Sequence, residues 1–572
     1  MMTNRSNDAT SVQSEYVRVS KSLNPKEEEY VKRRQAVVEK YLKDKGTEYK
    51  QEHVPVIAVL GSGGGERAMV GLLGALAQME EEKLLDSITY LCGVSGSTWC
   101  MASLYEDPKW SVNVAADKKK IVDRLSDGKF SISDMLDWLS VAVEDENYSL
   151  TDFWAATVVF NSIKEINGQH LSEQEARDST NPYPIYTAID KGLKQDNQTA
   201  PCWFEISPHE AGYSHVGAYV DTSLFGSQFE NGKPKTLPKE EDMLYLQGLC
   251  GSALADGMED TKQILQWIWD WIRKLLGFYS SVNESKNSGK LALSEDSAYQ
   301  VLQCLVRLHD SYENNDESVA LLDKIMKLQQ ESNTNYPRVH VLQKNVWLNM
   351  NTEEKQKYVA HLSIEICKAL EGLFGPLEGS FFAVVKILGK TIIAAYNWTW
   401  GTKFNFLYKY PAKEVEHIPA ALLSDEKRNL EDAGILLNSP YVAALRPERK
   451  VDLILSFDFS SDDPFLTVKK AADYCKEAGI PFPSLVIEPG EEKNPKDFYV
   501  FKDETKAPIV IHIPLFNTVN CGENIEEWRR RYKTFQGPYS KEMIEDLLLV
   551  SSLNVKNNKE KILNEIKAVC AC

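Results

Sequence analysis

The sequence predicts an α/β protein, in which helices pack on the faces of a β-sheet. Short apolar runs typical of buried strands occur near both ends of the chain, at 54–60, 87–94, 450–460 and 507–516. Segments of helical pattern and length stand between them. Alternation of this kind favours helices packed against a sheet. The 572 residues, 43% of them hydrophobic, are enough for a large core.

The first elements follow one another with little connecting chain. Residues 54–60 (VPVIAVL) predict a strand, 66–85 a helix and 87–94 a second strand, and the sequence SGSTWCMASLYE turns sharply into another helix. Near the other end, the stretch DPFLTVKKAADYCKEAG predicts a helix between the two apolar runs. Residues from about 255 to 400 differ, because they are helical and charged in places, and we expect them to form an inserted cap.

A glycine-rich loop follows the first strand. Residues 61–65 contain four glycines and one serine, and the helix after them opens with Glu66 and Arg67. A Walker A loop needs a lysine where this loop has Glu66, so a P-loop is excluded. The dinucleotide fingerprint needs a small residue at the same place, so it is a poor match. The remaining interpretation is an anion site made of backbone N–H groups at a helix N-terminus, with Arg67 adding positive charge. Such a loop can serve as an oxyanion hole.

A serine follows the second strand. The sequence CGVSGSTW sets Ser95 between Gly93 and Gly96, which resembles a nucleophile elbow, although Ser97 occupies the last position of the G-x-S-x-G consensus. By itself such a string is more often an ordinary turn. Together with the glycine loop, it predicts that Ser95 is a nucleophile.

The residues alone leave the base for this serine open. None of the nine histidines stands in a convincing loop after a strand. Asp432, before Ala433 and Gly434, could present a carboxylate at a sheet edge, but an aspartate that simply starts a turn is the ordinary interpretation of this segment.

Four long motifs in the same order resemble the catalytic domain of the cytosolic phospholipase A₂ family, and within it most closely the gamma type. They are GSGGGERAM from Gly61, GVSGSTW from Gly93, the Asp432 turn followed by LRPERKVDLILSFDFS, and GTKFNFLY at 401–408. The resemblance runs from about residue 25 to 565. It implies a three-layer α/β/α patatin-like lipase fold, related to the α/β-hydrolases, with an inserted helical cap.

The resemblance also implies a serine–aspartate dyad. Ser95 would be the nucleophile and Asp432 its base, with no histidine between them. Gly63 and Gly64 would donate backbone N–H groups to the oxyanion, and Arg67 would meet the phospholipid phosphate or steady the charge of the site. No cofactor and no metal are expected.

The activity that follows is hydrolysis of the sn-2 ester of glycerophospholipids through an acyl-serine, with lysophospholipase and transacylase activity beside it. Calcium-dependent relatives carry a lipid-docking module before the catalytic domain, whereas 60 residues precede Gly61 here, so we expect calcium independence. Two alternatives remain: a non-catalytic lipid-binding or scaffold protein, and a serine esterase acting on other acyl esters. Activity that rises when the substrate forms vesicles would separate this last alternative from a phospholipase.

Charge and targeting signals narrow the partners. The net charge of −18 opposes binding to nucleic acid. No apolar run near the start resembles a signal peptide, so a cytoplasmic protein is expected, peripherally associated with intracellular membranes and acting on phospholipids and lysophospholipids. Oligomeric state stays open.

Two apolar stretches of the cap are candidates for membrane contact. The segment 264–280 combines three tryptophans with leucines and basic residues, a composition suited to a membrane interface, but a cap helix packed on the core explains it equally well. The segment 380–400 is similarly apolar, and its two lysines argue against a spanning helix.

The expected domain limits are a flexible tail at 1–24, a catalytic domain at 25–565 and a C-terminal tail at 566–572. The tail contains Cys570 and Cys572, which could carry lipid or remain unmodified, and Val569 stands where a C-a-a-X box needs cysteine. The ten cysteines show neither a C-x-x-C pair nor zinc spacing, which predicts reduced thiols.

A few further charged residues receive no firm catalytic role. Asp452 and Asp458 are expected to hold the ends of a strand. Arg446 resembles a family arginine near the active site but could equally form an ordinary ion pair, and Glu66 is assigned no role.

Overall fold

The computed structural model describes residues 16–50, 53–177, 179–197, 199–237, 240–252, 261–285, 293–331, 339–374, 380–411, 417–503, 507–534 and 536–571. The chain divides into two compact units. Unit 1 comprises 1–129, 158–253 and 401–572, and unit 2 comprises 130–157 and 254–400.

Unit 1 is built on a large mixed sheet. In the order in which they pair, ten of its strands are β1 (Val17–Val19), β7 (Ala218–Asp221), β6 (Glu210–Tyr213), β5 (Trp203–Ile206), β4 (Tyr183–Asp190), β3 (Tyr90–Gly93), β2 (Ile57–Gly61), β12 (Leu453–Asp458), β14 (Ile509–Pro514) and β13 (Tyr499–Phe501). Strand β11 (Lys427–Asp432) also pairs with β4, and β10 (Thr402–Phe404) pairs with β11. A separate hairpin joins β8 (Phe229–Glu230) and β9 (Lys233–Pro234).

The centre of the sheet is parallel and its flanks are antiparallel. The pairs β14–β12, β12–β2, β2–β3 and β3–β4 are parallel, whereas β5, β6, β7, β1, β11 and β13 pair antiparallel. Every residue of β2, β3 and β12 is buried, as expected for parallel strands covered on both faces. Loops that leave the carboxyl ends of these strands therefore meet along one edge.

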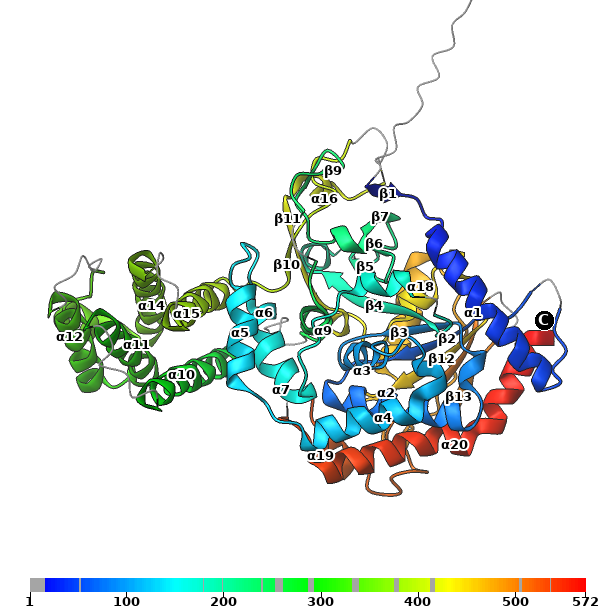
Figure 1. Cartoon of the computed structure of the whole chain (residues 1–572). Coiled ribbons are helices and arrows are strands. Elements are labelled where there is room, and N and C mark those ends of the chain that lie inside the picture. The colour runs from blue at the N-terminus through cyan, green and yellow to red at the C-terminus, as the bar shows by residue number, and fades with distance from the viewer. Residues whose placement is uncertain are drawn as a thin grey trace, which may run out of the picture. The chain divides into compact units, whose positions relative to one another are not determined.

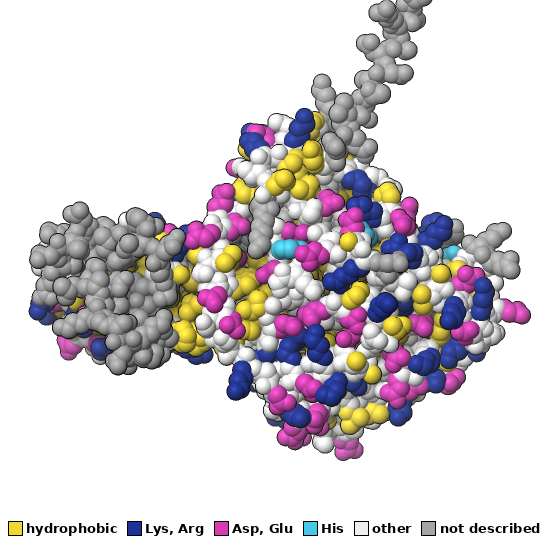
Figure 2. Space-filling model, viewed as in Figure 1, with side chains coloured by type: hydrophobic (Ala, Val, Ile, Leu, Met, Phe, Trp, Pro, Cys, Tyr) yellow, Lys and Arg dark blue, Asp and Glu magenta, His cyan; other side chains and the backbone are white. Residues whose placement is uncertain are grey.

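Helices cover the sheet as separate layers. Unit 1 contains α1 (Pro25–Asp44), α2 (Glu66–Glu81), α3 (Gly96–Leu104), α4 (Trp110–Asp127), α7 (Phe160–Ile163), α8 (Lys191–Gln195), α9 (Met243–Cys250), α16 (Ala420–Ser424), α17 (Tyr441–Ala444), α18 (Leu466–Ala478), α19 (Ile525–Arg531) and α20 (Lys541–Ala571). Helices α2, α4 and α20 lie together on one side of the sheet, and α18 lies on the other (Figure 1). Charged side chains of both signs are scattered over the face of unit 1 seen in Figure 2.

Small residues let the long C-terminal helix approach α2 closely. A methyl group on Gly74 would lie 2.9 Å from the Leu548 carbonyl oxygen of α20, and the Ser551 hydroxyl of the same helix donates to the Gly71 carbonyl. This packing buries nearly all of α2. The helix whose first turn follows the glycine loop is therefore held rigidly.

The predicted α/β/α architecture is confirmed, while its limits need correction. β1 pairs with β7, so residues 17–19, expected in a flexible tail, belong to the sheet. α20 continues to Ala571, so most of the expected tail at 566–572 is helical. The sequence also did not predict β13, which adds an antiparallel edge strand after β14.

The C-terminal end contains Cys570 and Cys572. Cys570 is buried on α20 and burial raises the pKa of its thiol to about 11, which fits the unmodified alternative. Cys572 lies outside the described residues.

Unit 2 is helical. It contains α5 (Ile132–Ala142), α6 (Leu150–Trp154), α10 (Thr261–Ser285), α11 (Leu293–Ser311), α12 (Asn315–Glu331), α13 (Lys344–Asn349), α14 (Thr352–Phe374) and α15 (Ser380–Tyr396). The expected insertion at 255–400 accounts for the last six, but α5 and α6 come from residues 130–157, which the sequence analysis did not assign to the cap.

The tryptophan-rich segment is helix α10. Trp269 and Trp271 are buried, with the ring of Trp269 stacked 4.2 Å from that of His309 and Trp271 in edge contact with Phe130 at 5.4 Å. These rings pack inside the protein, which favours the core-packed alternative over the membrane-interface one.

Helix α15 carries the two lysines of the second apolar stretch. Lys386 pairs with Glu144 at 2.6 Å, and Lys390 donates to the carbonyls of Val143 and Asp145 at 2.7 and 2.9 Å. Within the described part of the chain, no helix combines the length and the apolarity that crossing a membrane requires.

Candidate active site

Three loops of unit 1 meet at one edge of the parallel strands. The glycine loop leaves the end of β2, Ser95 follows β3, and the segment after Asp432 runs from the end of β11. Gly61 and Gly93 are register partners at the ends of their strands, so the two loops start side by side. Ligands of open α/β sheets bind at edges of this kind.

Ser95 has the backbone conformation of a nucleophile elbow. Ser95 lies between β3 and the first turn of α3. Its φ of 52° and ψ of −127° lie in a backbone region that residues other than glycine rarely adopt. A methyl group on Gly96 would lie 1.8 Å from the Gly65 carbonyl oxygen, so only glycine fits after the serine. The same contact brings the elbow directly against the glycine loop.

Asp432 is a buried carboxyl next to this serine. Its Oδ1 accepts the Gly434 N–H at 2.8 Å, while Oδ2 is buried and accepts no conventional hydrogen bond from the described residues. Burial raises the pKa of Asp432 to about 7, although the Gly434 N–H and the Ser95 hydroxyl both act to lower it. The Ser95 hydroxyl therefore lies close enough to Asp432 to influence its pKa.

In the glycine loop, the Gly63 N–H makes a hydrogen bond within the protein, whereas the Gly64 N–H makes none with the described residues. The Gly63 N–H donates to the Asn438 carbonyl at 3.0 Å, so it could reach an oxyanion only after that bond breaks. Gly64 and Gly65 have φ values of 148° and 58°, which open the loop in a way that residues with side chains resist. Among the residues that the structure describes, none accepts a hydrogen bond from the N–H of Gly64 or Gly96.

Asn438 is a residue of the site that the sequence analysis missed. Besides accepting from Gly63 through its backbone, it donates from Nδ2 to the Gly63 carbonyl at 3.3 Å and to the Ser460 hydroxyl at 3.2 Å. A methyl group on Gly63 would lie 2.3 Å from its Oδ1. Its place six residues after Asp432, on the segment that crosses the site, was the available signal.

Arg67 does not lie where a substrate-binding arginine was expected. Its side chain is buried, and Nε, Nη1 and Nη2 donate to the Phe459 carbonyl, the Tyr532 carbonyl and the Thr534 hydroxyl. The guanidinium is thus committed to neighbouring loops and is not exposed to a phosphate in this conformation. It also packs against Gly64, where an added methyl group would lie 2.8 Å from Nη2.

Glu66 is buried beside it. Burial raises the pKa of Glu66 to about 8, and its carboxyl oxygens accept the Tyr539 N–H at 3.1 and 3.3 Å. Glu66 and Arg67 therefore both anchor the first turn of α2 to the segment between α19 and α20, and Arg67 also anchors it to the loop after β12.

The remaining charged candidates have structural contacts. Asp452 accepts from the Val56 N–H at 2.8 Å and Asp458 from the Ser460 N–H at 2.8 Å, so both hold the ends of β12, as expected. Arg446 precedes β12 and so lies toward the opposite ends of the parallel strands, where it approaches Glu448 at 3.4 Å.

Among the described residues, no histidine is hydrogen-bonded to Ser95 or Asp432. The buried His512 lies on β14 with Nε2 2.7 Å from the Pro464 carbonyl oxygen. Throughout the described ranges, no three His, Cys, Asp or Glu side chains come together as a metal ion would require.

The chain matches a known family model and several known proteins. Residues 57–260 match the model of the lysophospholipase catalytic domain, a range that contains the glycine loop and Ser95. The chain is 37% identical to cytosolic phospholipase A2 gamma of Mus musculus over 91% of its own length and 87% of that protein. It is 36% identical to the Homo sapiens protein of the same name over 97% of both chains.

Solved structures show the same fold. Human GIVD cytosolic phospholipase A2 superposes with a TM-score of 0.64 at 23% identity, covering 97% of this chain and 68% of that one. The same human protein in complex with methyl gamma-linolenyl fluorophosphonate superposes with a TM-score of 0.60. The resemblance that the sequence motifs carry is confirmed.

Proposed function

The chain belongs to the cytosolic phospholipase A₂ family, and we propose that it hydrolyses the sn-2 acyl ester of glycerophospholipids with Ser95 as nucleophile and Asp432 as base. The observation that carries the proposal is the pairing of a strained serine elbow with a buried carboxyl whose pKa is raised. A serine held in this conformation exposes its hydroxyl to substrate, and a carboxyl in this environment is basic enough to accept the proton.

The proton transfer is the first step. A carboxylate with an ordinary pKa near 4 would be a poor base for a hydroxyl, whereas a pKa of about 7 matches neutral solution. As the Ser95 oxygen attacks the ester carbonyl, its proton passes to Asp432, and the carbonyl oxygen becomes negative.

Backbone N–H groups then hold the oxyanion. The N–H groups of Gly64 and Gly96 are suited to this, since neither is engaged by the described residues. Gly63, expected as a donor together with Gly64, instead supports the loop through Asn438. In comparable sites the loss of one such donor costs about 3 kcal/mol. Arg67, through its contact with Gly64, is proposed to position this loop.

The tetrahedral intermediate collapses to an acyl-serine, and the protonated Asp432 returns its proton to the leaving lysophospholipid. Water, deprotonated by the same carboxylate, then releases the fatty acid. A lysophospholipid can occupy either position of this scheme: as the ester attacked, which is lysophospholipase activity, or as the alcohol that replaces water, which is transacylation. All these steps use groups of the chain itself, and we propose that they proceed without calcium.

The test is release of fatty acid from phosphatidylcholine vesicles that carry different acyl chains at sn-1 and sn-2, in the presence of a chelator. We expect sn-2 acid from the wild type and none above background from Ser95→Ala. Ser103→Ala is the matched control, because Ser103 lies on α3, the helix that Ser95 precedes, and its hydroxyl accepts a hydrogen bond from Arg124 at 2.7 Å. Release that survives Ser95→Ala would contradict the proposed nucleophile.

Two further arms separate the finer claims. Restoration of activity by added calcium after its loss in chelator would contradict calcium independence while keeping the nucleophile. Incubation with lysophosphatidylcholine alone should yield free fatty acid, from hydrolysis, and phosphatidylcholine, from transacylation. The absence of either product would remove that activity from the proposal.

A further inference from the structure

A cavity of unit 1 lies toward the ends of the parallel strands that are opposite to Ser95. Its volume is about 440 Å³, within the range of pockets that hold small ligands. Lys450 and Val451 line it just before β12 begins, and Pro508 just before β14. The catalytic loops leave the other ends of these strands, so this cavity is separate from the candidate active site.

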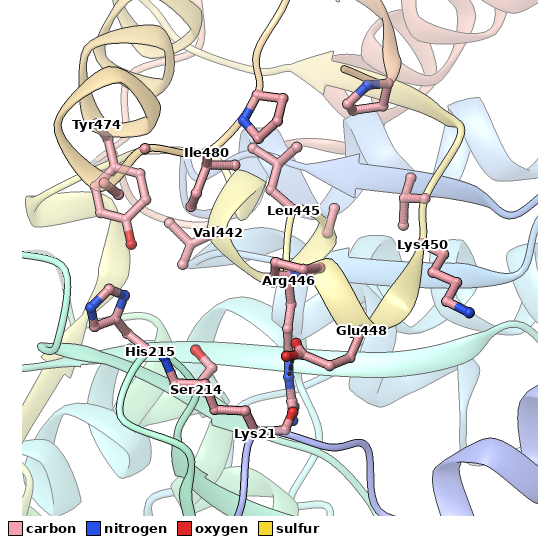
Figure 3. A pocket seen from close by; sticks show the side chains of 17 residues that line it. Lys21, Ser214, His215, Val442, Leu445, Arg446, Glu448, Lys450, Tyr474 and Ile480 are labelled. Carbon is pink, nitrogen blue, oxygen red and sulfur yellow. Dashed lines mark hydrogen bonds and ion pairs between the residues drawn. The ribbon is translucent and has the colours of Figure 1, made fainter. Parts of the chain in front are cut away.

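One wall of the cavity is apolar. It is formed where the end of α18 meets α17, and Figure 3 shows Val442, Leu445 and Ile480 grouped together on this wall. Pro481, Val451 and Pro508 extend the same surface. A wall of this composition fits a hydrocarbon chain.

The facing wall is polar and mainly basic. Among the residues that line the cavity, Lys21, Arg446 and Lys450 are positive and Glu448 is negative, in a chain whose net charge is −18. Glu205 adds a second carboxylate 3.9 Å from Arg446 Nη1. Lys21 and Lys450 are exposed, whereas Arg446 is 5% exposed. The basic character therefore continues from the surface to a buried guanidinium.

Several polar atoms around this cavity are buried without a hydrogen-bond partner. Arg446 donates from Nη2 to the carbonyls of Lys21 and Ser22, both at 3.0 Å, but its Nε and Nη1 make no hydrogen bond. The hydroxyls of Ser214 and Tyr474 are in the same state. Buried donors without partners are rare in native proteins, and they indicate that a bound group accepts their hydrogen bonds.

Two carboxylates form ion pairs with Arg446, but neither accepts a hydrogen bond from its Nε or Nη1. Glu448 approaches Arg446 Nε only to 3.4 Å, and Glu205 approaches Nη1 only to 3.9 Å because it pairs with Arg449 at 2.8 Å. The Tyr474 hydroxyl points toward His215 across the cavity (Figure 3). An anionic acceptor between Arg446 and these hydroxyls would complete the arrangement.

We propose that this cavity is a second, non-catalytic lipid site that binds an anionic group carried on a hydrocarbon chain. The negative head accepts from Arg446, Ser214 and Tyr474, and the chain lies along Val442, Leu445 and Ile480. A long-chain fatty acid has this chemistry, as does a monoacyl phosphate. The site takes no part in ester hydrolysis and does not depend on the proposed function.

The experiment measures binding to the full chain carrying Ser95→Ala, so that no probe is consumed. Oleate, monooleoyl phosphate, oleyl alcohol and inorganic phosphate are titrated separately, below the concentration at which each aggregates. We expect oleate or monooleoyl phosphate to bind at least tenfold more tightly than oleyl alcohol or inorganic phosphate, and the tighter of the two identifies the head group. Equal binding of oleyl alcohol would overturn the role of the charge.

Variants locate the site. In the same background, Ile480→Asp places a negative charge beside the hydrocarbon chain of the lipid, and we expect about tenfold weaker binding. Tyr474→Phe removes one hydrogen-bond donor to the head group, and we expect about fivefold weaker binding. Both side chains are only partly buried, so folding should survive, which circular dichroism would check. Lys476→Glu, an exposed change on α18 outside the cavity, is the matched control. Affinity equal in all three variants would mean that the lipid binds elsewhere and would overturn the proposal.

Discussion

The two ends of the central parallel strands treat buried charge in opposite ways. At the carboxyl ends, Asp432 is buried beside Ser95 without a cation, and its pKa rises to about 7. At the amino ends, Arg449 pairs with Glu27 at 2.9 Å and with Glu205 at 2.8 Å, and all three side chains are at most 5% exposed. The carboxyl ends leave this carboxyl without a cation, whereas at the amino ends one buried guanidinium bridges two buried carboxylates.

The difference indicates what each end contributes. A buried carboxylate without a partner costs stability but gains basicity, which catalysis needs. A buried ion pair adds little net stability by itself, yet it is expensive to break. The pairing also joins α1, which carries Glu27, to the loop before β12 and to β5.

The largest effect expected is that of Asp432→Asn on turnover. Asparagine keeps the shape and the bond from Gly434 but accepts no proton, so kcat on phosphatidylcholine vesicles should fall by about 10⁴-fold. The folded aspartate holds its proton up to about pH 7 and the unfolded one only to about 4, so the stability of the wild type falls as pH rises between these values. At pH 8 the free energy of unfolding of the variant, measured by denaturant titration, should therefore exceed that of the wild type by up to about 4 kcal/mol. Turnover near the wild-type value would move the base to another residue.

Breaking the opposite end should reverse the pattern. Arg449→Met leaves Glu27 and Glu205 buried without their cation, and we expect the free energy of unfolding to drop by about 3–5 kcal/mol. Denaturant titration measures it. Adding Glu27→Gln to this variant removes one uncompensated charge and should recover part of the loss. A double variant that is less stable than Arg449→Met would show that charge compensation is not the reason.

The sequence could predict the features that leave a local pattern, and it could not predict contacts between distant segments. Strand and helix patterns gave β2, β3, β12 and β14 because fully buried strands leave apolar runs. The glycine loop and Ser95 were readable because their backbone requires particular residues, and Asp432 came only from the family resemblance. Contacts between distant segments left no local pattern, so the Asn438 bond to Gly63, the burial of Arg67 and the place of 17–19 in the sheet were not predictable.

The pH profile sharpens the comparison at the catalytic end. Because Asp432 acts as a base, kcat/KM should rise about tenfold per pH unit below its pKa and level off above about pH 7. The profile is measured between pH 5 and 9 on vesicles of neutral lipid, so that surface charge does not change with pH. A profile that is already flat from pH 5 would mean that the carboxyl is ionised in the active form.

A smaller effect on turnover is expected from Asn438, which contacts the glycine loop. Asn438→Ala removes the side-chain bonds to Gly63 and Ser460 but keeps the backbone bond from Gly63, so the loop should loosen without collapsing. We expect a loss of about tenfold in kcat, comparable to one hydrogen bond, with little change in KM. An equal loss in KM and none in kcat would place Asn438 in substrate binding instead.

Glu66→Gln should have the smallest effect, and it asks whether every buried carboxyl at the catalytic end serves catalysis. The pKa of Glu66 is raised to about 8 by burial, although Lys164 and the Tyr539 N–H act against this shift. The folded state therefore holds this proton to higher pH than the unfolded state, and wild-type stability falls as pH rises from about 4.5 to 8. Glutamine still accepts from Tyr539 and carries no charge. The variant should match the wild type at pH 4 and exceed its free energy of unfolding by about 1 kcal/mol or more at pH 9, with turnover changed less than threefold. A large loss of turnover would mean that the charge of Glu66, and not only that of Asp432, acts on the glycine loop, and the contrast between the two ends of the strands would then rest on a pair of carboxyls.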